Sequence, residues 1–483
     1  MGSTSFKQWL KEPRWPPGLR YALAWHAAST FAGFVVAAVL LIIQPFELDR
    51  GLGDRGRDAF YKVASFAYPE GRSPKSIVVE LDQRFLDAEH RTWPVSLGVH
   101  ADVLDAINSH QPRAIFIDFA FIDQRNDPEL GYFLDTVRRI AETTPIYFAA
   151  APSSMAPKVA RPEIAALQST PNITFVSVAL PEEEPPASTY RIEDDHDHRT
   201  PAAVRLYQDL CATPGACVLP ERRADMDIWW AVHRNRGPNR RAFNCRGDDL
   251  IHMCDHLPHG VVQRGLSMTA LVLRGIVGPP IDPVPMPYTP VINVSDLMNG
   301  NSVRVWEPQM QGAVVFYGGS IGFVGDTVDN PVNGPTTGVQ RHAMAFDNLV
   351  ALEGAYVQSR PPFGWGFKGH TIVLCGLLAL ASLLVRAAIT LRRANLRLQP
   401  HLREHIFAWF DAATFVIGAL AIAVFEFGVI HVGPSAWAPV LVAALAGDFL
   451  SKRPMVRVLL VTALGRRGAT QPKKEKKRPR WRR

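Results

Sequence analysis

Hydrophobic and polar positions are distributed along the chain in two different ways. Four long apolar runs occupy the beginning and the last quarter of the sequence, whereas the segment between them mixes shorter apolar stretches with polar ones. About 20 apolar residues are enough to cross a bilayer as a helix. We therefore expect four transmembrane helices, at residues 21–46, 369–391, 405–430 and 435–450, of which the last is the shortest and carries Asp448 near its end.

The segment between the first and second runs alternates strand-like and helix-like patterns. Residues 75–82 and 113–123 are apolar enough for buried strands, and residues 97–110 carry apolar side chains at helical spacing. Strand–helix alternation is typical of a mainly parallel sheet flanked by helices, so the fold class is α/β. Further predicted elements are the helix 128–143, the strands 145–152 and 172–180, the helix 261–278, the strand 312–318 and the helix 338–354.

Charge is distributed unevenly and predicts an orientation. Residues 47–367 contain 29 Lys and Arg against 39 Asp and Glu, although the whole chain has 52 against 45. Basic residues cluster instead in the N-terminal segment 1–20, before residue 405 and in the tail 451–483. Because basic loops favour the cytoplasmic side, we expect both termini there. Residues 47–367 would form an extracytoplasmic (periplasmic) domain of a bacterial inner-membrane protein.

The first apolar run has a second interpretation, as a cleaved signal peptide. Its apolar stretch is longer than the roughly 7–15 residues usual for such a segment. It ends in IIQPFELDR rather than in a small-x-small cleavage site. The pattern therefore favours an uncleaved signal anchor.

Four of the five cysteines lie in the loop-rich stretch 181–260. They form two close pairs, Cys211 with Cys217 and Cys245 with Cys254. An even number of cysteines in an oxidising compartment indicates disulfides. Four cysteines allow three pairings, so the sequence leaves the connectivity open, and free thiols are the alternative.

Three segments, in their order along the chain, resemble the CHASE domain of type 2, an extracellular sensor domain associated with cyclases and histidine kinases. They are IVVELDQRFLDAEHRTWP, QPRAIFIDFAFIDQRNDPELGYFL and GAVVFYGGSIGFVGDTVDNPVNGPTTGVQRHAMAFDNLV. The family layout, with one span before the domain and three after it, is also similar. The resemblance implies a sensor that binds a small ligand or a periplasmic protein.

The segment after the last apolar run departs from this family pattern. Members commonly continue into a cyclase or kinase domain, whereas 33 residues follow residue 450 here. The resemblance therefore implies a sensor without an output domain, which relays to a separately encoded cytoplasmic cyclase or kinase. We also expect a homo-oligomer. The alternative function is a structural or assembly subunit of a membrane complex that uses the domain as an interaction module.

Residues 318–322, GGSIG, match the G-x-S-x-G pattern of serine hydrolases, and acidic residues and His342 follow in the expected order. That pattern requires a helix directly after the serine. Here FVGDTVDNPVNGPTTG follows, in which Gly, Asn and Pro break helices. We therefore expect a structural turn rather than a catalytic serine, no enzyme activity, and a His342 that caps or packs the final helix.

A ligand site is a better interpretation of these residues. In open α/β sheets, ligands bind beyond the carboxyl ends of the strands. Carboxylates at that edge could accept a cationic or hydroxyl-bearing ligand or a divalent ion, and capping of helix N-termini is the alternative role for the aspartates. The candidate ligand-binding residues are Asp82, Asp123, Gly319, Ser320, Asp326 and His342.

Two further segments carry candidate chemistry. Histidines lie near acids and Cys254 in residues 193–200 and 251–260, but their spacings match no standard zinc site, so we expect no metal and no cofactor.

The basic tail 451–483 is expected to contact anionic lipid or a cytoplasmic effector. Nucleic acid is the weakest of the three interpretations of the tail.

Overall fold

The computed structural model of the chain divides into two compact units, which we describe separately. Unit 1 comprises Met1–Gly53, Phe363–Phe425 and Pro434–Arg483, and unit 2 comprises Asp54–Pro362 and Glu426–Gly433. The structure describes residues 27–28, 30–35, 37–39, 48–65, 68, 76–122, 125–150, 161–178, 189–193, 198–211, 217, 219, 224–231, 288–298, 309–321, 327–359, 366–393, 414, 416–428, 431–433, 440–442 and 445.

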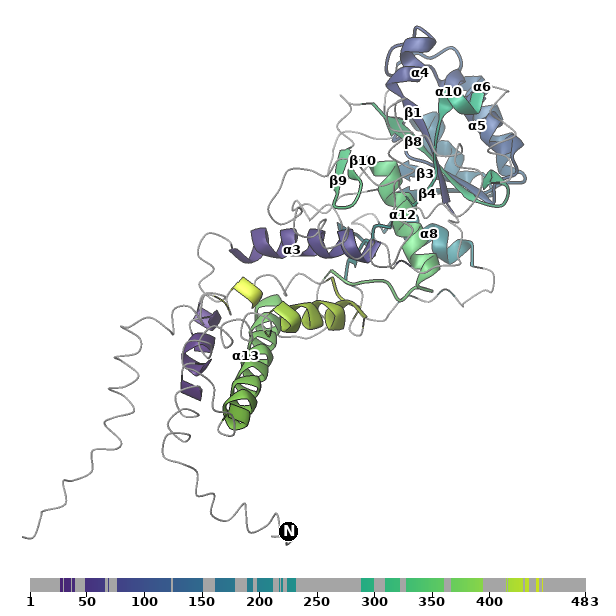
Figure 1. Ribbon diagram of the computed structural model, residues 1–483. Helices are drawn as coiled ribbons and strands as arrows, with labels where there is room; N and C mark the ends of the chain where they lie inside the picture. The colour runs from purple at the N-terminus through teal and green to yellow at the C-terminus, as the bar shows by residue number, and fades with distance from the viewer. Residues whose placement is uncertain are drawn as a thin grey trace, which may run out of the picture. The chain divides into compact units, whose positions relative to one another are not determined.

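Unit 2 is built on a six-stranded parallel sheet (Figure 1). The strands are β1 (Ser76–Asp82), β2 (Ala114–Ile117), β3 (Ile146–Ala150), β4 (Ile173–Ser177), β7 (Val291–Asn293) and β8 (Val314–Ser320). Their spatial order is β4-β3-β2-β8-β1-β7, and every neighbouring pair is parallel. Strand β8 therefore lies between β1 and β2, although it comes last of the six in the sequence.

Helices cover both faces of the sheet and bury two separate apolar cores. One face carries α4 (Gln83–Ala88), α5 (Leu97–Ser109), α6 (Leu130–Ala141) and α10 (Val294–Met298), and the other carries α8 (Ala202–Asp209) and α12 (Gly338–Ala351) (Figure 1). Alternate residues of one strand belong to different cores, since Val79 packs on the α5 face and Val78 on the α12 face. Both faces of β1 and β2 are buried, as is typical of central parallel strands.

Most predicted elements of the α/β domain are confirmed with shorter bounds, and the predicted strand 312–318 is shifted to Val314–Ser320. The predicted strand 113–123 is wrong in its second half, because β2 ends at Ile117 and Asp118 lies half-buried beyond it. The predicted helix 261–278 lies outside the described residues. A two-stranded hairpin of β9 (Thr327–Asn330) and β10 (Gly334–Thr337) occupies much of the stretch for which we expected a structural turn.

The remaining described elements of unit 2 are one long helix and four short elements. They are α3 (Leu48–Ala64, which begins in unit 1), α7 (Pro162–Ala165), η4 (Ala166–Ser169), β5 (Thr189–Tyr190) and β6 (Met226–Asp227). Strands β5 and β6 pair with each other as a separate antiparallel ladder.

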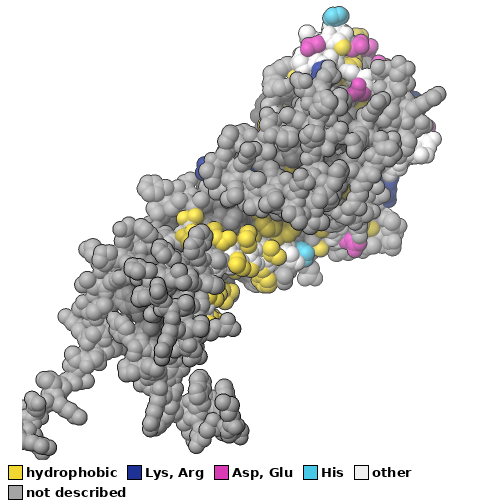
Figure 2. Space-filling view, viewed as in Figure 1, with side chains coloured by type: hydrophobic (Ala, Val, Ile, Leu, Met, Phe, Trp, Pro, Cys, Tyr) yellow, Lys and Arg dark blue, Asp and Glu magenta, His cyan; other side chains and the backbone are white. Residues whose placement is uncertain are grey.

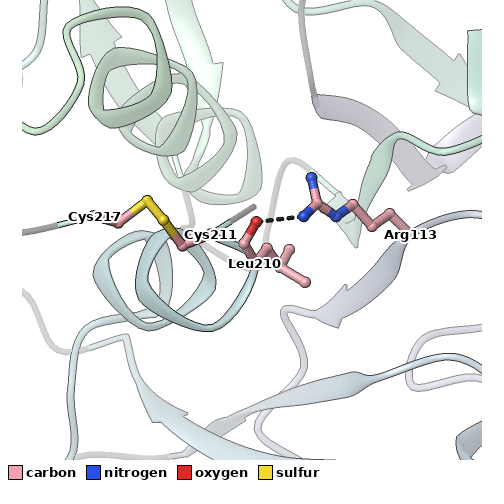
Figure 3. The surroundings of a disulfide bond; sticks show 4 residues. All are labelled: Arg113, Leu210, Cys211 and Cys217. Carbon is pink, nitrogen blue, oxygen red and sulfur yellow. Dashed lines mark hydrogen bonds between the residues drawn. A yellow bond between two sulfur atoms is a disulfide. The ribbon is translucent and has the colours of Figure 1, made fainter. Parts of the chain in front are cut away.

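One predicted disulfide is present. Cys211 and Cys217 are bonded directly after α8 (Figure 3). Beside them, the Arg113 guanidinium, which precedes β2, donates a hydrogen bond to the carbonyl oxygen of Leu210. The bridge therefore closes a loop at the point where α8 is attached to the sheet. Cys245 and Cys254 lie outside the described residues.

The described residues of unit 1 lie mostly in helices, which pack through one face. Besides α13 (Gly366–Arg393), residues 30–35, 37–39, 416–425 and 440–442 are helical, and the helix that contains 416–425 continues to residue 428 in unit 2. Ala37, Leu374, Cys375, Leu378 and Val440 form its buried core. Large apolar side chains are exposed at other positions of the same helices, and Figure 2 shows such side chains gathered over residues 416–428.

Within the described part of the chain, we find no helix whose length and apolarity suffice to cross a membrane. The four predicted spans therefore receive no support from the described helices. Much of each of the runs 21–46, 405–430 and 435–450 lies outside the described residues. The membrane topology stays a prediction.

Gly318 allows α12 to approach the sheet closely. A Cβ atom at this position of β8 would lie 2.7 Å from the Cβ atom of Val339 in the first turn of α12. Real Cβ atoms do not come so near a neighbouring side chain, so a larger residue at position 318 would displace the helix. The first glycine of the GGSIG pattern thus serves packing.

We expect Gly318→Ala to lower the free energy of unfolding by about 1–3 kcal/mol, the usual cost of overpacking a filled core. Gly131→Ala is the matched control. A Cβ atom there would meet nothing within 4 Å inside α6, so this change should stabilise by up to about 1 kcal/mol through helix propensity. Denaturant unfolding of the purified chain measures both, and equal effects of the two changes would contradict the packing role of Gly318.

Candidate functional site

The carboxyl edge of β1 and β8 is the point where the connections of the sheet diverge. The chain leaves β1 towards α4 and α5 on one face, and it leaves β8 towards the hairpin and α12 on the other face. Such a switch point opens a crevice outside the strand ends, which is where open α/β sheets bind ligands. The topology therefore selects this edge as the candidate site.

Two of the predicted ligand-binding positions meet directly at this edge. Asp82 and Ser320 are register partners at the ends of β1 and β8, and Leu81 and Gly319 are partners one position earlier. The Asp82 carboxylate is buried and accepts a hydrogen bond from the backbone N–H of Phe85 at 3.0 Å. Asp82 thus caps α4, which confirms the capping alternative for this residue. Ser320 is half-buried.

A buried carboxylate that the sequence analysis did not select lies next to these residues. Glu80 is 2% exposed, and its register partner in β8 is Gly318. Its Oε1 atom accepts hydrogen bonds from Thr337 Oγ1 at 2.8 Å and from Gln340 Nε2 at 2.6 Å. Thr337 caps α12, so Glu80 ties the end of β1 to the N-terminus of that helix. A negative charge is favourable there because the helix N-terminus carries partial positive charge.

An aromatic cluster lies on the α5 face near the same edge. The Phe119 ring lies 3.3 Å from where a Cβ atom of Gly319 would be, and it also packs against Trp93 and Tyr317. His100 Nδ1 is 2.9 Å from the Tyr317 hydroxyl. Burial, together with the charge of Arg125 and against that of Asp127, lowers the pKa of His100 to about 3. His100 is therefore neutral, and its contact with the hydroxyl group holds the side chain of Tyr317, a residue of β8, on the α5 face of the sheet.

His342 does not lie at the edge with Asp82 and Ser320. It projects from α12 towards the middle of the sheet, where its ring packs on Phe116 at 5.3 Å between centroids. Its Nδ1 atom is 2.7 Å from the Tyr190 hydroxyl. Burial, and secondarily the charge of Arg341, lowers the pKa of His342 to about 3. The neutral ring therefore packs in the core, as the alternative interpretation of His342 expected.

The candidate set is thus brought together in part. Asp82, Gly319 and Ser320 form one edge with Glu80, whereas His342 belongs to the core on the α12 face. Asp123 and Asp326 lie outside the described residues. Glu80 could have been found in the sequence, because it is a charged residue inside the apolar strand VVELD.

This edge offers hydrogen-bonding groups rather than a metal cluster. Among the residues that the structure describes, no three His, Cys, Asp or Glu side chains are placed to hold a metal ion. The histidine-rich stretch 251–260 and most of the acids near 195 fall outside those residues. The carboxylates of Glu80 and Asp82 at this edge are buried and already accept hydrogen bonds, whereas Ser320 is half-buried.

The two buried histidines predict how stability depends on pH. Both bind a proton less readily in the folded state than at their ordinary pKa near 6.5. Between about pH 6.5 and 3 the unfolded chain therefore binds more protons, and the free energy of unfolding falls as the pH falls. Each pKa unit corresponds to about 1.4 kcal/mol.

We expect His342→Gln to flatten this acid-induced loss between pH 7 and pH 4, measured by denaturant unfolding at both pH values. His90→Gln is the control, because His90 is exposed in the loop after α4 and lies outside both apolar cores. An unchanged slope in His342→Gln would contradict a neutral, buried His342.

Comparison with protein families supports the architecture described above. The CHASE2 domain model matches residues 32–384, well over half of the 483 residues. Comparisons with curated proteins and with solved structures gave no match. The matched range contains the whole six-stranded sheet, the edge with Glu80, Asp82 and Ser320, and α12. The chain belongs to the CHASE2 domain family.

Proposed function

We propose that the protein is a membrane-anchored extracytoplasmic sensor. Its CHASE2 domain would bind a small ligand or a periplasmic protein at the carboxyl edge of β1 and β8 and relay this to a separately encoded effector. CHASE2 is a sensor-type domain family, which is compatible with this role. The observation that carries the proposal is that α12 begins at that edge, bound to Glu80, and leads along the chain towards α13.

Helix α12 is attached to the domain at both ends. At its start, Thr337 and Gln340 donate hydrogen bonds to Glu80. Near its end, the buried Asp347 carboxylate accepts hydrogen bonds from the Ser76 hydroxyl at the start of β1 and from the Thr289 hydroxyl. A displacement of the helix start is therefore carried along one rigid element to the opposite end of β1.

A ligand at this edge would act by binding two arrangements of α12 unequally, because only differential affinity shifts a conformational equilibrium. A cationic or hydroxyl-bearing ligand could compete with Thr337 and Gln340 for Glu80. It would then loosen the start of α12, whereas a ligand that bridges Glu80 and the helix would tighten it. Either change is a signal that the helix can pass on.

Exposed apolar stripes on the helices of unit 1 support the membrane anchor. The exposed side chains of α13 recur at spacings of three or four, while Leu374, Cys375 and Leu378 of the same helix are buried. A stripe of this kind is far more apolar than the surface of a soluble monomer and fits lipid contact. The exposed residues are Phe31, Val35, Val39, Val373, Leu377, Leu380, Leu384, Val416, Ile417, Leu420, Val424, Phe425, Val442 and Leu445.

The anchor that we propose is the four-span arrangement predicted from the sequence, with helices at 21–46, 369–391, 405–430 and 435–450. Both termini would be cytoplasmic and residues 47–367 periplasmic in a bacterial inner membrane. The basic tail 451–483 would contact anionic lipid or a cytoplasmic cyclase or kinase. The protein would act as a homo-oligomer without an enzymatic activity of its own.

Alkaline phosphatase fusions test the topology, because this reporter is active only in the periplasm. We expect high activity for a fusion joined within 47–367, for example after Glu353, and low activity for one joined at residue 400. Both fusion proteins should be present in membranes at similar amounts. Equal activity at the two positions would contradict the proposed spans.

Capture from native membranes tests the relay. We compare the full-length chain with one truncated after Arg453, and we expect a cyclase or kinase to co-purify with the first and to be lost with the second. Loss is expected because the tail carries the basic docking segment. Partners that persist without the tail, at a constant ratio to the protein, would instead support an assembly subunit and contradict the relay through the tail.

A further inference from the structure

Three short chain segments of unit 2 meet in one hydrogen-bonded ladder, which we call the junction. They are residues 225–229, 357–359 and 431–433. Gln358 is the central residue, because it bridges to Met226 on one side and to Val432 on the other. The junction therefore joins parts of the chain that are about 75 to 200 residues apart in the sequence.

The backbone hydrogen bonds of the junction are short. On one side, Asp227 donates to Val357 at 2.7 Å, and Ser359 donates to Asp225 at 2.8 Å. On the other side, Gln358 donates to His431 at 2.7 Å, and Gly433 donates to Gln358 at 2.8 Å. Residues 357–359 are thus held on both sides, like a central strand.

Trp229 connects the junction to α12 and α3. Its backbone N–H donates to Asn348 Oδ1 at 2.8 Å, and Asn348 Nδ2 donates back to the Trp229 carbonyl at 3.2 Å. Its indole N–H donates to the Ala64 carbonyl at the end of α3 at 3.0 Å. Asn348 is fully buried on α12. A movement of α12 must therefore move Trp229 or break this paired contact.

Phe427 packs into the same place from the last turn of the helix 416–428. Its ring lies 4.5 Å from that of Trp229, 5.1 Å from Phe60 and 6.1 Å from Tyr61, measured between centroids. The loop that follows is fixed by a hydrogen bond from the Val432 N–H to the Glu426 carbonyl at 3.0 Å. The end of this helix is thereby packed against the junction.

Two of the three segments of the junction, residues 357–359 and 431–433, are close in the chain to helices of unit 1. Helix α3, which Trp229 contacts, follows the helical residues 30–35 and 37–39. Residue 359 precedes α13 by a few residues, and residues 431–433 follow the helix 416–428 and precede 440–442. The junction is thus where the connections to these helices are bonded to one another and to α12.

We propose that the junction is the element through which the CHASE2 domain controls the helices of unit 1. The inference rests on the proposed sensor function and names its internal route, from Glu80 through α12 and the Asn348–Trp229 contact to residues 357–359 and 431–433. Because these segments are bonded in one ladder, the connections respond together rather than singly.

Gly433 offers a way to disturb the junction without touching the sheet. A Cβ atom there would lie 1.9 Å from Asp227 Oδ2, so Gly433→Ala forces residues 433 and 227 apart. Gly428 is a matched control five residues earlier, because a Cβ atom there meets nothing within 4 Å. Glu80→Ala takes the place of a ligand in this experiment, because it removes the acceptor that holds Thr337 and Gln340 at the start of α12.

The test is hydrogen–deuterium exchange of peptides from α13, measured on the full-length chain in lipid nanodiscs. We expect Glu80→Ala to change exchange in 366–393 by about threefold. The same substitution should have no further effect on α13 in a Gly433→Ala chain and its full effect in a Gly428→Ala chain. This is the non-additivity expected of coupled sites.

Two outcomes would overturn the proposal. One is that Glu80→Ala changes the exchange of α13 as much in the Gly433→Ala chain as in the otherwise unaltered chain. The other is a Glu80→Ala effect that is confined to α12 in the otherwise unaltered chain. Should Gly433→Ala abolish protection of β8 and so fail to fold, Phe427→Leu replaces it, because this change weakens the packing on Trp229 without a backbone clash.

Neither a ligand nor an effector enters this measurement. If Glu80→Ala alters the exchange of α13 through the junction but no effector is captured, the relay in the proposed function is overturned and the role of the junction is retained. If an effector is captured but the effect of Glu80→Ala on α13 does not depend on the junction, only the proposed role of the junction is overturned.

Discussion

The pairing of β8 between β1 and β2 is the contact on which the rest of the domain depends. Ser76, Val314 and Ala114 lie in register across the three strands, so the centre of the sheet is incomplete until residues 314–320 reach it. Both cores depend on this strand, because alternate residues of β8 face α5 and α12. The arrival of β8 also creates the switch point, since its connection leaves on the opposite face from that of β1.

The close packing of α12 on the sheet depends on the same strand, β8. Val339 of α12 lies directly against Gly318, and this approach lets the start of the helix reach Glu80. A buried carboxylate is costly unless it is hydrogen-bonded, and Glu80 and Asp347 both receive donors from another element. The helix is thus fixed on the sheet by one close contact and two buried acids.

Much of this architecture was predictable from local patterns. The strands 75–82 and 312–318 and the helices 97–110 and 338–354 follow from apolar periodicity. The sequence indicated disulfides but left their connectivity open, and the structure pairs Cys211 with Cys217. The candidate edge was predicted in part, through Asp82, Gly319 and Ser320. The role of His342 was not determined, because a histidine on a helix near a glycine turn has the same sequence signature whether it faces a ligand or a core ring such as Phe116.

By itself, the sequence determined the class of the domain, its alternation of strands and helices, and the four apolar runs, because these depend on the spacing of side chains along a local element. Only the tertiary structure decided the strand order, the partners of Glu80, and the ladder of residues 225–229, 357–359 and 431–433. These features join residues that are distant in the chain. No local pattern records which backbone groups will meet, because parallel pairing is set by the packing of whole elements rather than by neighbouring residues.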